Sequence, residues 1–449
     1  MDAFALVTHA EPSAVVAWRG GEPVTLGKFL RDVAYLAARL PPGRHVLNAC
    51  ADRYRFAVGL AAALVSERIS LLPPSHTPEV VRQMKLFAAD AFCLVDGPTA
   101  IDLPQFLFEE SPASGTTPAV PMIPSDRTVA FVFTSGSTGL PVPHRKAWGP
   151  LVRDVRAEAA ALLLPAGASP QVLGTVPPQH MYGIESTVLL PWQSAGALSA
   201  RHPFYPADIC TALDELPRPR VLVTTPVHLR ALLDARVQVP AVDLVLSATA
   251  PLSAELAREA ETQLRAPLQE IYGSTETGQI ASRRSTATPY WTLLPGIELN
   301  HREGRCWASG GHVVPAMPLG DVIELAEAGR FLLHGRIGDL VNIAGKRNSL
   351  AYLNHQLLAI EGVVDGVFFM PQELARDSVT RLCAFAVAPG LDAARVRAGL
   401  RERIDPVFMP RPLVLLEELP RNTTGKLTRE TMEALAQAHV RGRRTPGET

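Results

Sequence analysis

The chain has 449 residues, of which 47% are hydrophobic and 19% are charged, and its formal net charge is -1. This length exceeds what one hydrophobic core comfortably supports, so two or more domains are expected. The near-zero net charge excludes the broad basic field of a protein whose main work is to hold DNA or RNA. Any anionic ligand must therefore be held by local groups.

The cysteines and the N-terminal residues indicate the cellular compartment in which the protein is expected. The five cysteines are far apart and form no CxxC pair or Cys/His cluster, which predicts a reducing compartment and no zinc site. The N-terminus carries Asp2 and no basic segment. The longest apolar run, Phe56 to Val65, has about half the length that crosses a bilayer. We therefore expect a cytoplasmic protein with no membrane partner.

The first half of the chain predicts an alternation of strands and helices. Residues 53–65 predict a helix, and residues 69–87 a short strand, a proline turn and a second helix. A surface connection is expected from 97 to 125, where proline, serine and threonine dominate.

Four short apolar segments then run into turn or helix-start residues. They are 128–133, 221–223, 242–247 and 268–272. Apolar strands separated by helices predict a parallel sheet covered on both faces, and ligands bind at the carboxyl ends of such strands.

Beyond about Gly338 the pattern changes to a smaller α+β region. Strands are predicted near 367–370 and 382–388, and a helix near 392–404. We therefore predict an N-terminal domain over residues 1–337 and a C-terminal domain over residues 338–449.

The loop after the first of the four strands is rich in hydroxyls and glycine. Its residues are Thr134, Ser135, Gly136, Ser137, Thr138 and Gly139. Glycines let backbone amides turn toward an anion and the hydroxyls add donors, so this composition suits a phosphate group. No GK[ST] follows, so it is not the common nucleotide P-loop. Taken alone, the same residues also describe a flexible turn.

A second loop of this kind follows the fourth strand and carries an acid. It consists of Tyr272, Gly273, Ser274, Thr275, Glu276, Thr277 and Gly278. A lone loop glutamate is usually a solvated charge, but beside a polyphosphate it is a natural Mg2+ ligand, since Mg2+ takes one or two carboxylates plus phosphate oxygens. Four short motifs follow in order: GD at 320–321, GRIGD at 335–339, GKR at 345–347 and PRNTTGK at 420–426.

With these motifs in this order, the sequence resembles the ANL superfamily of adenylate-forming enzymes. That superfamily includes acyl- and aryl-CoA synthetases, nonribosomal peptide adenylation domains and luciferases. The resemblance extends from the Arg53 region to Arg429. It implies an α/β fold, with a large N-terminal domain of layered α/β subdomains and a small mobile α+β C-terminal domain. It also implies an AMP-forming acid–thiol ligase that uses ATP and Mg2+.

The resemblance assigns nucleotide-binding roles to the motif residues. Residues 134–139 would hold the β- and γ-phosphates of ATP. Tyr272 would pack near adenine, with Gly273 and Ser274 in the same loop. Thr275 would face the α-phosphate, and Glu276 would hold Mg2+.

The resemblance also assigns roles outside these two loops. Asp321 matches the acid that hydrogen-bonds the ribose hydroxyls, and Arg336 matches the arginine that also reaches the ribose. Ala250 and Pro251 belong to the segment against which adenine and substrate pack. His180 borders the acyl pocket and, in many relatives, the thiol tunnel.

Lys426 resembles the lysine of the mobile domain that bridges the substrate carboxylate and the α-phosphate. Attack of a carboxylate on an α-phosphate brings two anions together, and a fixed ammonium stabilises the charge that develops. An isolated lysine would more often be a surface residue in a turn. The complete motif series favours the catalytic role here.

Three features depart from the family pattern. Residues 141–143 read PVP where relatives usually carry PKG, so the phosphate-loop lysine is absent at Val142. Arg145 or Lys146 could replace its charge; the alternative is a cradle made of backbone amides alone. Gly338 stands at the hinge in place of the usual Asp or Lys, which permits wider backbone rotation. The N-terminal part is also short for the family.

Residues 134–149 resemble a narrower group, the stand-alone AMP-ligases of aryl-polyene and xanthomonadin-type pigment pathways. That group loads hydroxybenzoate-like acids onto an acyl carrier protein. We therefore predict activation of a 4-hydroxybenzoate-like acid and transfer to the phosphopantetheine thiol of an acyl carrier protein. Two alternatives stay open: an acyl- or aryl-CoA synthetase, and a non-catalytic nucleotide-binding sensor or scaffold, which the missing lysine motivates.

Overall fold

The structure is a computed structural model, which describes residues 2–112, 115–135, 141–165, 167–336, 340–343, 346–371, 382–422 and 427–441. The chain forms two compact units. The first comprises Met1–Leu299 and Ala308–Met317, and the second Asn300–Trp307 and Pro318–Thr449. The second unit thus begins before the predicted boundary. Gly338 lies outside the described residues, so a hinge there stays a prediction.

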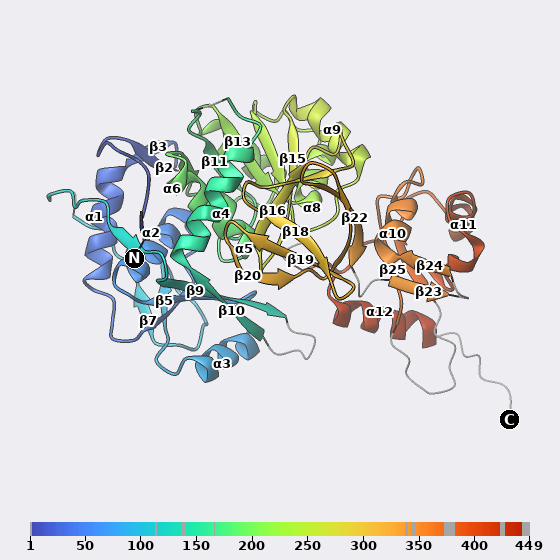
Figure 1. Ribbon diagram of the computed structural model, residues 1–449, viewed down its shortest axis with the longest axis horizontal. Helices are drawn as coiled ribbons and strands as arrows, with labels where there is room; N and C mark the ends of the chain where they lie inside the picture. The colour runs from blue at the N-terminus through green and yellow to red at the C-terminus, as the bar shows by residue number, and fades with distance from the viewer. Residues whose placement is uncertain are drawn as a thin grey trace. The chain divides into compact units, whose positions relative to one another are not determined.

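The smaller sheet of the first unit has the strand order β10-β9-β5-β4-β6-β7. Figure 1 shows its paired strands β9 and β10. Neighbouring strands are parallel, except that β9 and β10 are antiparallel. The strands are β4 (His45–Asn48), β5 (Ile69–Leu72), β6 (Phe92–Val95), β7 (Gln105–Leu107), β9 (Thr128–Ser135) and β10 (Pro141–Ala147). The accompanying helices are α1 (Leu26–Ala37), α2 (Arg53–Val65) and α3 (Pro78–Phe87). Helix α2 has the bounds that the sequence predicts and is buried over almost its whole length.

The larger sheet runs, within the first unit, in the order β17-β16-β15-β14-β13-β11-β12-β2-β3. Its central strands from β15 to β2 are parallel. The strands are β2 (Val15–Arg19), β3 (Glu22–Thr25), β11 (Gln171–Gly174), β12 (Ala197–Ser199), β13 (Arg220–Thr224), β14 (Leu244–Ser247), β15 (Leu268–Ser274), β16 (Gly278–Arg283) and β17 (Trp291–Leu293). All four predicted apolar strands are present as β9, β13, β14 and β15. The predicted α/β class is therefore confirmed.

Two helices beside the larger sheet begin at capping residues that are visible in the sequence. The Thr225 side chain accepts a hydrogen bond from the amide of His228, and Pro226 occupies the first turn of α8. Ser253 caps α9 in the same way, through the amide of Leu256. The helices beside the larger sheet are α4 (Trp148–Ala161), α5 (Met181–Ile184), the π-helix Glu185–Leu189, α6 (Leu190–Gln193), α7 (Pro206–Asp214), α8 (Pro226–Asp234) and α9 (Ala254–Leu264).

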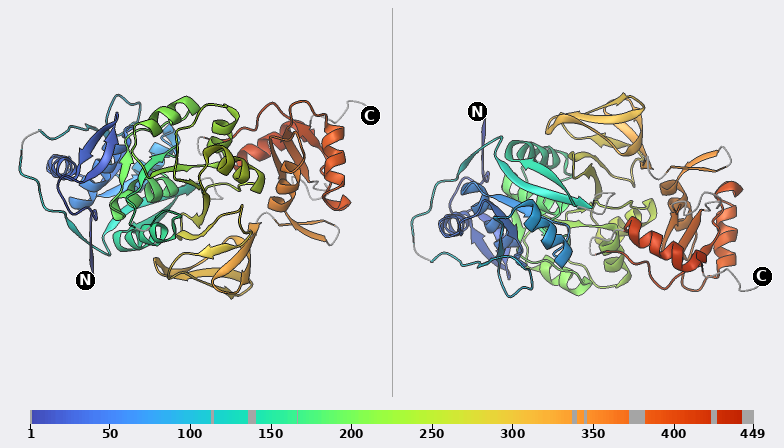
Figure 2. Two further views of the ribbon diagram at one scale, coloured as in Figure 1. Left: turned by 90° about the horizontal axis from the view of Figure 1, so that it is seen from above. Right: turned by 90° about the horizontal axis from the view of Figure 1, so that it is seen from below.

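Two small sheets complete this part of the chain. Strands β1 (Ala3–Ala5) and β8 (Met122–Pro124) pair antiparallel. Strands β18 (Glu298–Arg302), β19 (Arg305–Gly310) and β20 (Val313–Pro318) form a three-stranded sheet of their own (Figure 2). Residues 97–125, predicted to be a surface connection, contain the two short strands β7 and β8.

The second unit has the predicted α+β character. Its strands are β21 (Asp321–Ala326), β22 (Arg330–Arg336), β23 (Leu340–Ile343), β24 (Lys346–Ser349), β25 (Asp365–Phe369), β26 (Cys383–Val387) and β27 (Leu413–Leu415). Its helices are α10 (Leu350–Leu358), α11 (Ala393–Arg401), the 3-10 turn Pro406–Phe408 and α12 (Arg429–Arg441). Val396 and Leu400, four residues apart on α11, are both fully buried in the core of this unit. None of the helices in the described ranges combines the length and apolar character of a membrane span.

Candidate active site

The parallel strands β11, β13, β14 and β15 end along one edge of the larger sheet. Several residues predicted for the site follow these strands: His180 comes after β11, and Ala250 and Pro251 come after β14. Tyr272, Gly273 and Ser274 form the end of β15 itself. Because ligands bind at this edge of a parallel sheet, the topology supports the predicted location of the site.

The segment after β14 has an uncommon backbone conformation. Thr249 has φ of 79°, in the left-handed region that β-branched residues rarely adopt. Its side-chain oxygen is buried and has no hydrogen-bond partner among the described residues. Backbone strain of this kind is concentrated at binding sites, and here it directly precedes Ala250 and Pro251.

The segment that leads to His180 is fixed by a buried arginine. Arg53 is fully buried at the start of α2. Its Nη2 donates to the carbonyl oxygens of Gly174 at 2.8 Å and Val176 at 3.0 Å, and its Nη1 donates to Thr187 Oγ1. The sequence places Arg53 only at the start of a helix. The contacts show that it fixes the loop between β11 and α5, and His180 immediately precedes α5.

The loop after β15 is a tight turn that needs both of its glycines. A Cβ on Gly273 would lie 2.2 Å from the carbonyl oxygen of Gly278, and Gly278 itself has φ of +74°. Ser274 and Thr277 close the turn, with their hydroxyl oxygens 3.1 Å apart. Thr275 and Glu276 occupy the two positions between them.

His144 of β10 contacts residues of both hydroxyl-rich motifs. Its Nε2 is 3.0 Å from Thr134 Oγ1, at the end of β9, and 3.5 Å from Glu276 Oε1. Burial lowers the pKa of His144, although the Glu276 carboxylate opposes this. Thr134, the first residue of the predicted phosphate loop, therefore lies near the candidate metal ligand. Residues 136–139 lie outside the described residues, so their phosphate contacts stay a prediction.

The two cations that follow the first loop are in different environments. Lys146 Nζ donates to the carbonyl oxygen of Thr275 and lies 3.4 Å from that of Glu276. Arg145 instead donates to Thr128 Oγ1 at 2.8 Å and to the carbonyl oxygen of Asp126 at 2.9 Å. Of the two candidates to replace the lysine absent at Val142, only Lys146 contacts a motif loop among the described residues.

A group of buried carboxyls lies under the turn, here called the acid cluster. It consists of Asp154 and Glu158 on α4, and Glu185, which starts the π-helix. Asp154 and Glu185 are each 2% exposed and Glu158 is fully buried. Asp154 Oδ2 accepts a hydrogen bond from the amide of Gln279 at 3.3 Å. The cluster therefore supports the first residues of β16.

Burial dominates the protonation of the acid cluster. Burial raises the pKa of Asp154 well above its usual range, and the Glu185 charge raises it further. Burial also raises the pKa of Glu185, and that of Glu158 to about 8. Sequence reasoning missed this cluster. One sequence feature could have indicated it: Asp154 and Glu158, four residues apart, share a helix face with the apolar residues Leu151 and Val155.

The two predicted ribose contacts are cross-strand partners in the second unit. Asp321, the first residue of β21, pairs with Arg336, the last residue of β22. The sequence separates them by 15 positions, and the hairpin brings their backbones together. Lys426 lies outside the described residues, so its catalytic role stays a prediction.

The donors present suit a nucleotide with its Mg2+ ion. Within the described ranges, no group of three or more His, Cys, Asp and Glu side chains could hold a metal ion by itself. Mg2+ bound with a nucleotide needs one or two carboxylates, because phosphate oxygens and water supply its other ligands. Glu276, whose side chain is 39% exposed at the turn, meets that requirement.

The family model described as "AMP-binding enzyme" matches residues 14–351. The chain belongs to this family. The predicted ANL membership is thereby confirmed. Together with the CoA ligases that the chain resembles, described next, this confirms the predicted class of enzyme, an AMP-forming acid–thiol ligase.

This AMP-binding enzyme is similar to several ligases. It is 32% identical over 317 residues to a 4-coumarate–CoA ligase of Halorhodospira halophila, covering 68% of this chain and 76% of the relative. It is 26% identical over 370 residues to a 4-chlorobenzoate–CoA ligase of an Arthrobacter species, covering 72% and 69%. Its fold matches ATP-bound MatB from Rhodopseudomonas palustris with a TM-score of 0.80 at 18% identity, over 96% of this chain and 97% of that structure.

Proposed function

We propose that this AMP-binding enzyme activates a hydroxybenzoate-like aryl acid as its acyl-adenylate and then transfers the acyl group to a phosphopantetheine thiol. The observation that carries this proposal is the position of His144, which contacts Thr134 at the end of β9 and lies 3.5 Å from Glu276. This contact supports a nucleotide site in which the start of the predicted phosphate loop lies near the predicted metal ligand.

The reaction has two balanced steps. A carboxylate oxygen of the acid bonds to the α-phosphorus of ATP, and the bond from that phosphorus to the pyrophosphate oxygen breaks. The thiol sulfur then bonds to the acyl carbon, AMP leaves, and the thiol proton passes to solvent. In the first step, Thr275 would orient the α-phosphate and Lys426 would offset the charge that develops. Glu276 would hold Mg2+, which supplies charge neutralisation on the phosphates.

Two observations support an aryl acid as the substrate. The two relatives named above are ligases of 4-coumarate and 4-chlorobenzoate, both aryl acids. A flat ring also buries much apolar area and loses little rotamer entropy, whereas a flexible chain of equal area loses more. The narrower choice of hydroxybenzoate rests on the resemblance of residues 134–149 to the ligases of pigment biosynthesis.

The same resemblance supports an acyl carrier protein as the thiol acceptor. A second candidate is free CoA, because both relatives are named as CoA ligases. The two candidates share the adenylation step and differ only in the molecule that carries the thiol.

Pyrophosphate exchange across a panel of acids tests the adenylation step. We expect 3- or 4-hydroxybenzoate to exceed acetate, octanoate and amino acids by roughly tenfold or more, equivalent to about 1–2 kcal/mol. A preference for octanoate would reject the aryl acid. Exchange with none of the acids would favour the non-catalytic sensor or scaffold.

Intact mass spectrometry tests the acceptor separately. Phosphopantetheinylated carrier protein should gain the acyl mass faster than free CoA is converted to its thioester. Efficient thioester formation with CoA alone would reject the carrier protein and leave the adenylation step standing.

A further inference from the structure

The side chains of strand β10 point alternately to the two faces of the sheet. Successive side chains of a strand point to opposite faces, so His144 and Lys146 share one face and Arg145 lies on the other. The contacts agree, because His144 lies near Glu276 and Lys146 contacts Thr275, whereas Arg145 binds Thr128. The antiparallel register with β9 fixes this arrangement, with Lys146 opposite Ala130.

The ammonium group of Lys146 contacts the turn and interacts with the acid cluster. It donates to the carbonyl oxygen of Thr275 and lies 3.4 Å from that of Glu276. Its charge also interacts favourably with the carboxyls of Glu185 and Asp154, while burial disfavours the charged form. A carbonyl accepts most strongly from a charged donor, so these contacts are of the strong, charge-assisted type.

The turn has little freedom to settle elsewhere. A Cβ on Gly278 would lie 2.2 Å from Asp154 Oδ2 and 3.2 Å from Glu185 Oε1, so the backbone rests directly on these carboxyls. Without the Lys146 ammonium, the carbonyl oxygens of Thr275 and Glu276 would lose this charged donor. The position of the turn therefore depends on Lys146.

We propose that Lys146 is a positioning residue, which holds the Thr275–Glu276 turn through its two carbonyl groups and so orients Thr275 and Glu276 toward MgATP. The proposal rests on the proposed function of this site. It differs from direct replacement of the phosphate-loop lysine absent at Val142, because that lysine would act on the β- and γ-phosphates. Lys146 instead acts through the residues predicted to meet the α-phosphate and the metal.

This difference predicts which nucleotides respond to a change at Lys146. Misplacement of Thr275 would weaken every ligand with an α-phosphate, including AMP. Loss of a contact with the β- or γ-phosphate would weaken ATP alone.

The test measures binding of MgATP and of AMP by calorimetry, without any acid substrate. Lys146→Met should weaken both ligands about tenfold, the usual consequence of losing one charge-assisted hydrogen bond. Lys146→Arg keeps the cation and its donors and should recover most of the binding. Arg145→Ala, on the opposite face of the same strand, should bind both ligands within about twofold of the unchanged protein.

Melting temperatures establish that each variant is folded. If Lys146→Met does not fold, Lys146→Gln provides the comparison, since it keeps an N–H donor without the charge, and should weaken both ligands by a few-fold. Unchanged AMP binding in the folded Met or Gln variant would overturn the proposal, whether or not MgATP binding falls. If the unchanged protein bound neither nucleotide, the proposed function would fail instead.

Discussion

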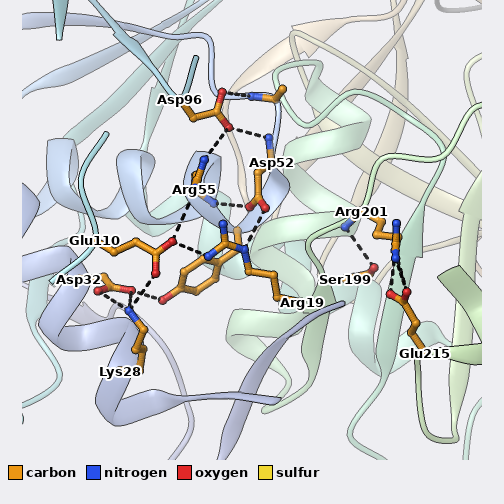
Figure 3. A network of polar contacts seen from close by, with 12 residues as sticks. Arg19, Lys28, Asp32, Asp52, Arg55, Asp96, Glu110, Ser199, Arg201 and Glu215 are labelled. Atoms are coloured by element: carbon orange, nitrogen blue, oxygen red, sulfur yellow. Dashed lines mark hydrogen bonds and ion pairs between the residues drawn. The ribbon is translucent and has the colours of Figure 1, made fainter. Parts of the chain in front are cut away.

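Two charged clusters in the first unit handle their charges in opposite ways. The first, here called the rim network, joins β2, α1 and α2 through a series of ion pairs (Figure 3). Its members are Arg19, Lys28, Asp32, Asp52, Arg55, Asp96 and Glu110. Arg19 lies 3.2 Å from Asp52 and 2.5 Å from Glu110. The second is the acid cluster beneath the candidate nucleotide site.

The two clusters differ in how their polar atoms are satisfied. In the rim network, Lys28 Nζ lies 2.9 Å from Asp32 and 3.3 Å from Glu110. In the acid cluster, Asp154 Oδ1, Glu158 Oε2 and Glu185 Oε1 have no hydrogen-bond partner among the described residues. One cluster pairs its carboxylates with cations near solvent, and the other holds them buried with few partners.

This difference indicates that the rim network stabilises the fold and that the acid cluster serves the candidate site. The cations of the rim network are partly exposed, so these ion pairs hold α1 and α2 at modest cost, and the buried Asp32 is itself paired with Lys28. Buried carboxyl oxygens without a hydrogen bond destabilise a fold, so their presence needs another reason. Perturbed acids are concentrated at functional sites, and this cluster supports the turn that carries Thr275 and Glu276.

The largest effect is expected from Lys426, which belongs to neither cluster. Lys426→Ala should slow pyrophosphate exchange roughly a hundredfold to a thousandfold, because one transition-state donor contributes about 3–4 kcal/mol. MgATP affinity should change little, in contrast with Lys146→Met. Rates of exchange and calorimetric affinities check both parts, and exchange at the unchanged rate would remove Lys426 from the mechanism.

The next effect tests how closely the turn rests on the acid cluster. Gly278→Ala should destabilise the protein by about 3 kcal/mol or more, because it adds a buried clash to the cost of a positive φ. Gly304→Ala is the matched control, since Gly304 has the same φ of +74° and no atom within 4 Å of the added Cβ. It should cost only about 1–2 kcal/mol. Urea unfolding measures both, and equal costs would show that the turn does not rest on the carboxyls.

The pH dependence of stability should distinguish the acid cluster from the rim network, first through Glu158. Burial raises the pKa of Glu158 to about 8, above its ordinary value of 4.5. The folded protein therefore keeps a proton that the unfolded chain releases, and stability falls as pH rises from about 5 to 8. Glu158→Gln removes this loss and should gain stability relative to the unchanged protein over that interval, by about 1.4 kcal/mol for each pH unit. A difference independent of pH would mean that Glu158 is ionised in the fold.

The smallest effect comes from the rim network and has the opposite sign. Burial raises the pKa of Glu110, but the hydrogen bond from Arg19 and the nearby cations outweigh it and lower the pKa to about 2. The pair contributes stability above pH 4.5, which is lost as pH falls toward 2. Glu110→Gln should therefore cost up to about 1 kcal/mol at pH 7 and almost nothing near pH 2. Unfolding midpoints at the two pH values decide this, and a larger cost at low pH would contradict the assignment.

Local patterns in the sequence were sufficient for much of the fold. Apolar runs between turn residues predicted β9, β13, β14 and β15, and α8 begins at Thr225 and Pro226, residue types that favour a helix start. These features depend on the backbone preferences and hydrophobicity of a few neighbouring residues. The order of the motifs indicated the family differently, through its resemblance to known adenylate-forming enzymes.

Contacts between distant segments required the tertiary structure. The sequence left Arg145 and Lys146 equivalent, and only the pairing of β10 with β9 shows which one meets Thr275, 129 positions away. The hairpin pairing of Asp321 with Arg336 is of the same kind.

By itself, the sequence determined the elements, the order of the motifs and the class of chemistry. The tertiary structure alone decided which charges are buried. Asp154 and Glu110 are both acids in the sequence, yet one is buried with few partners and the other is paired at the rim. Burial and partners, which set the pKa of an ionisable group, depend on segments far apart in the chain. No local pattern contains that information, because it arises only when those segments pack together.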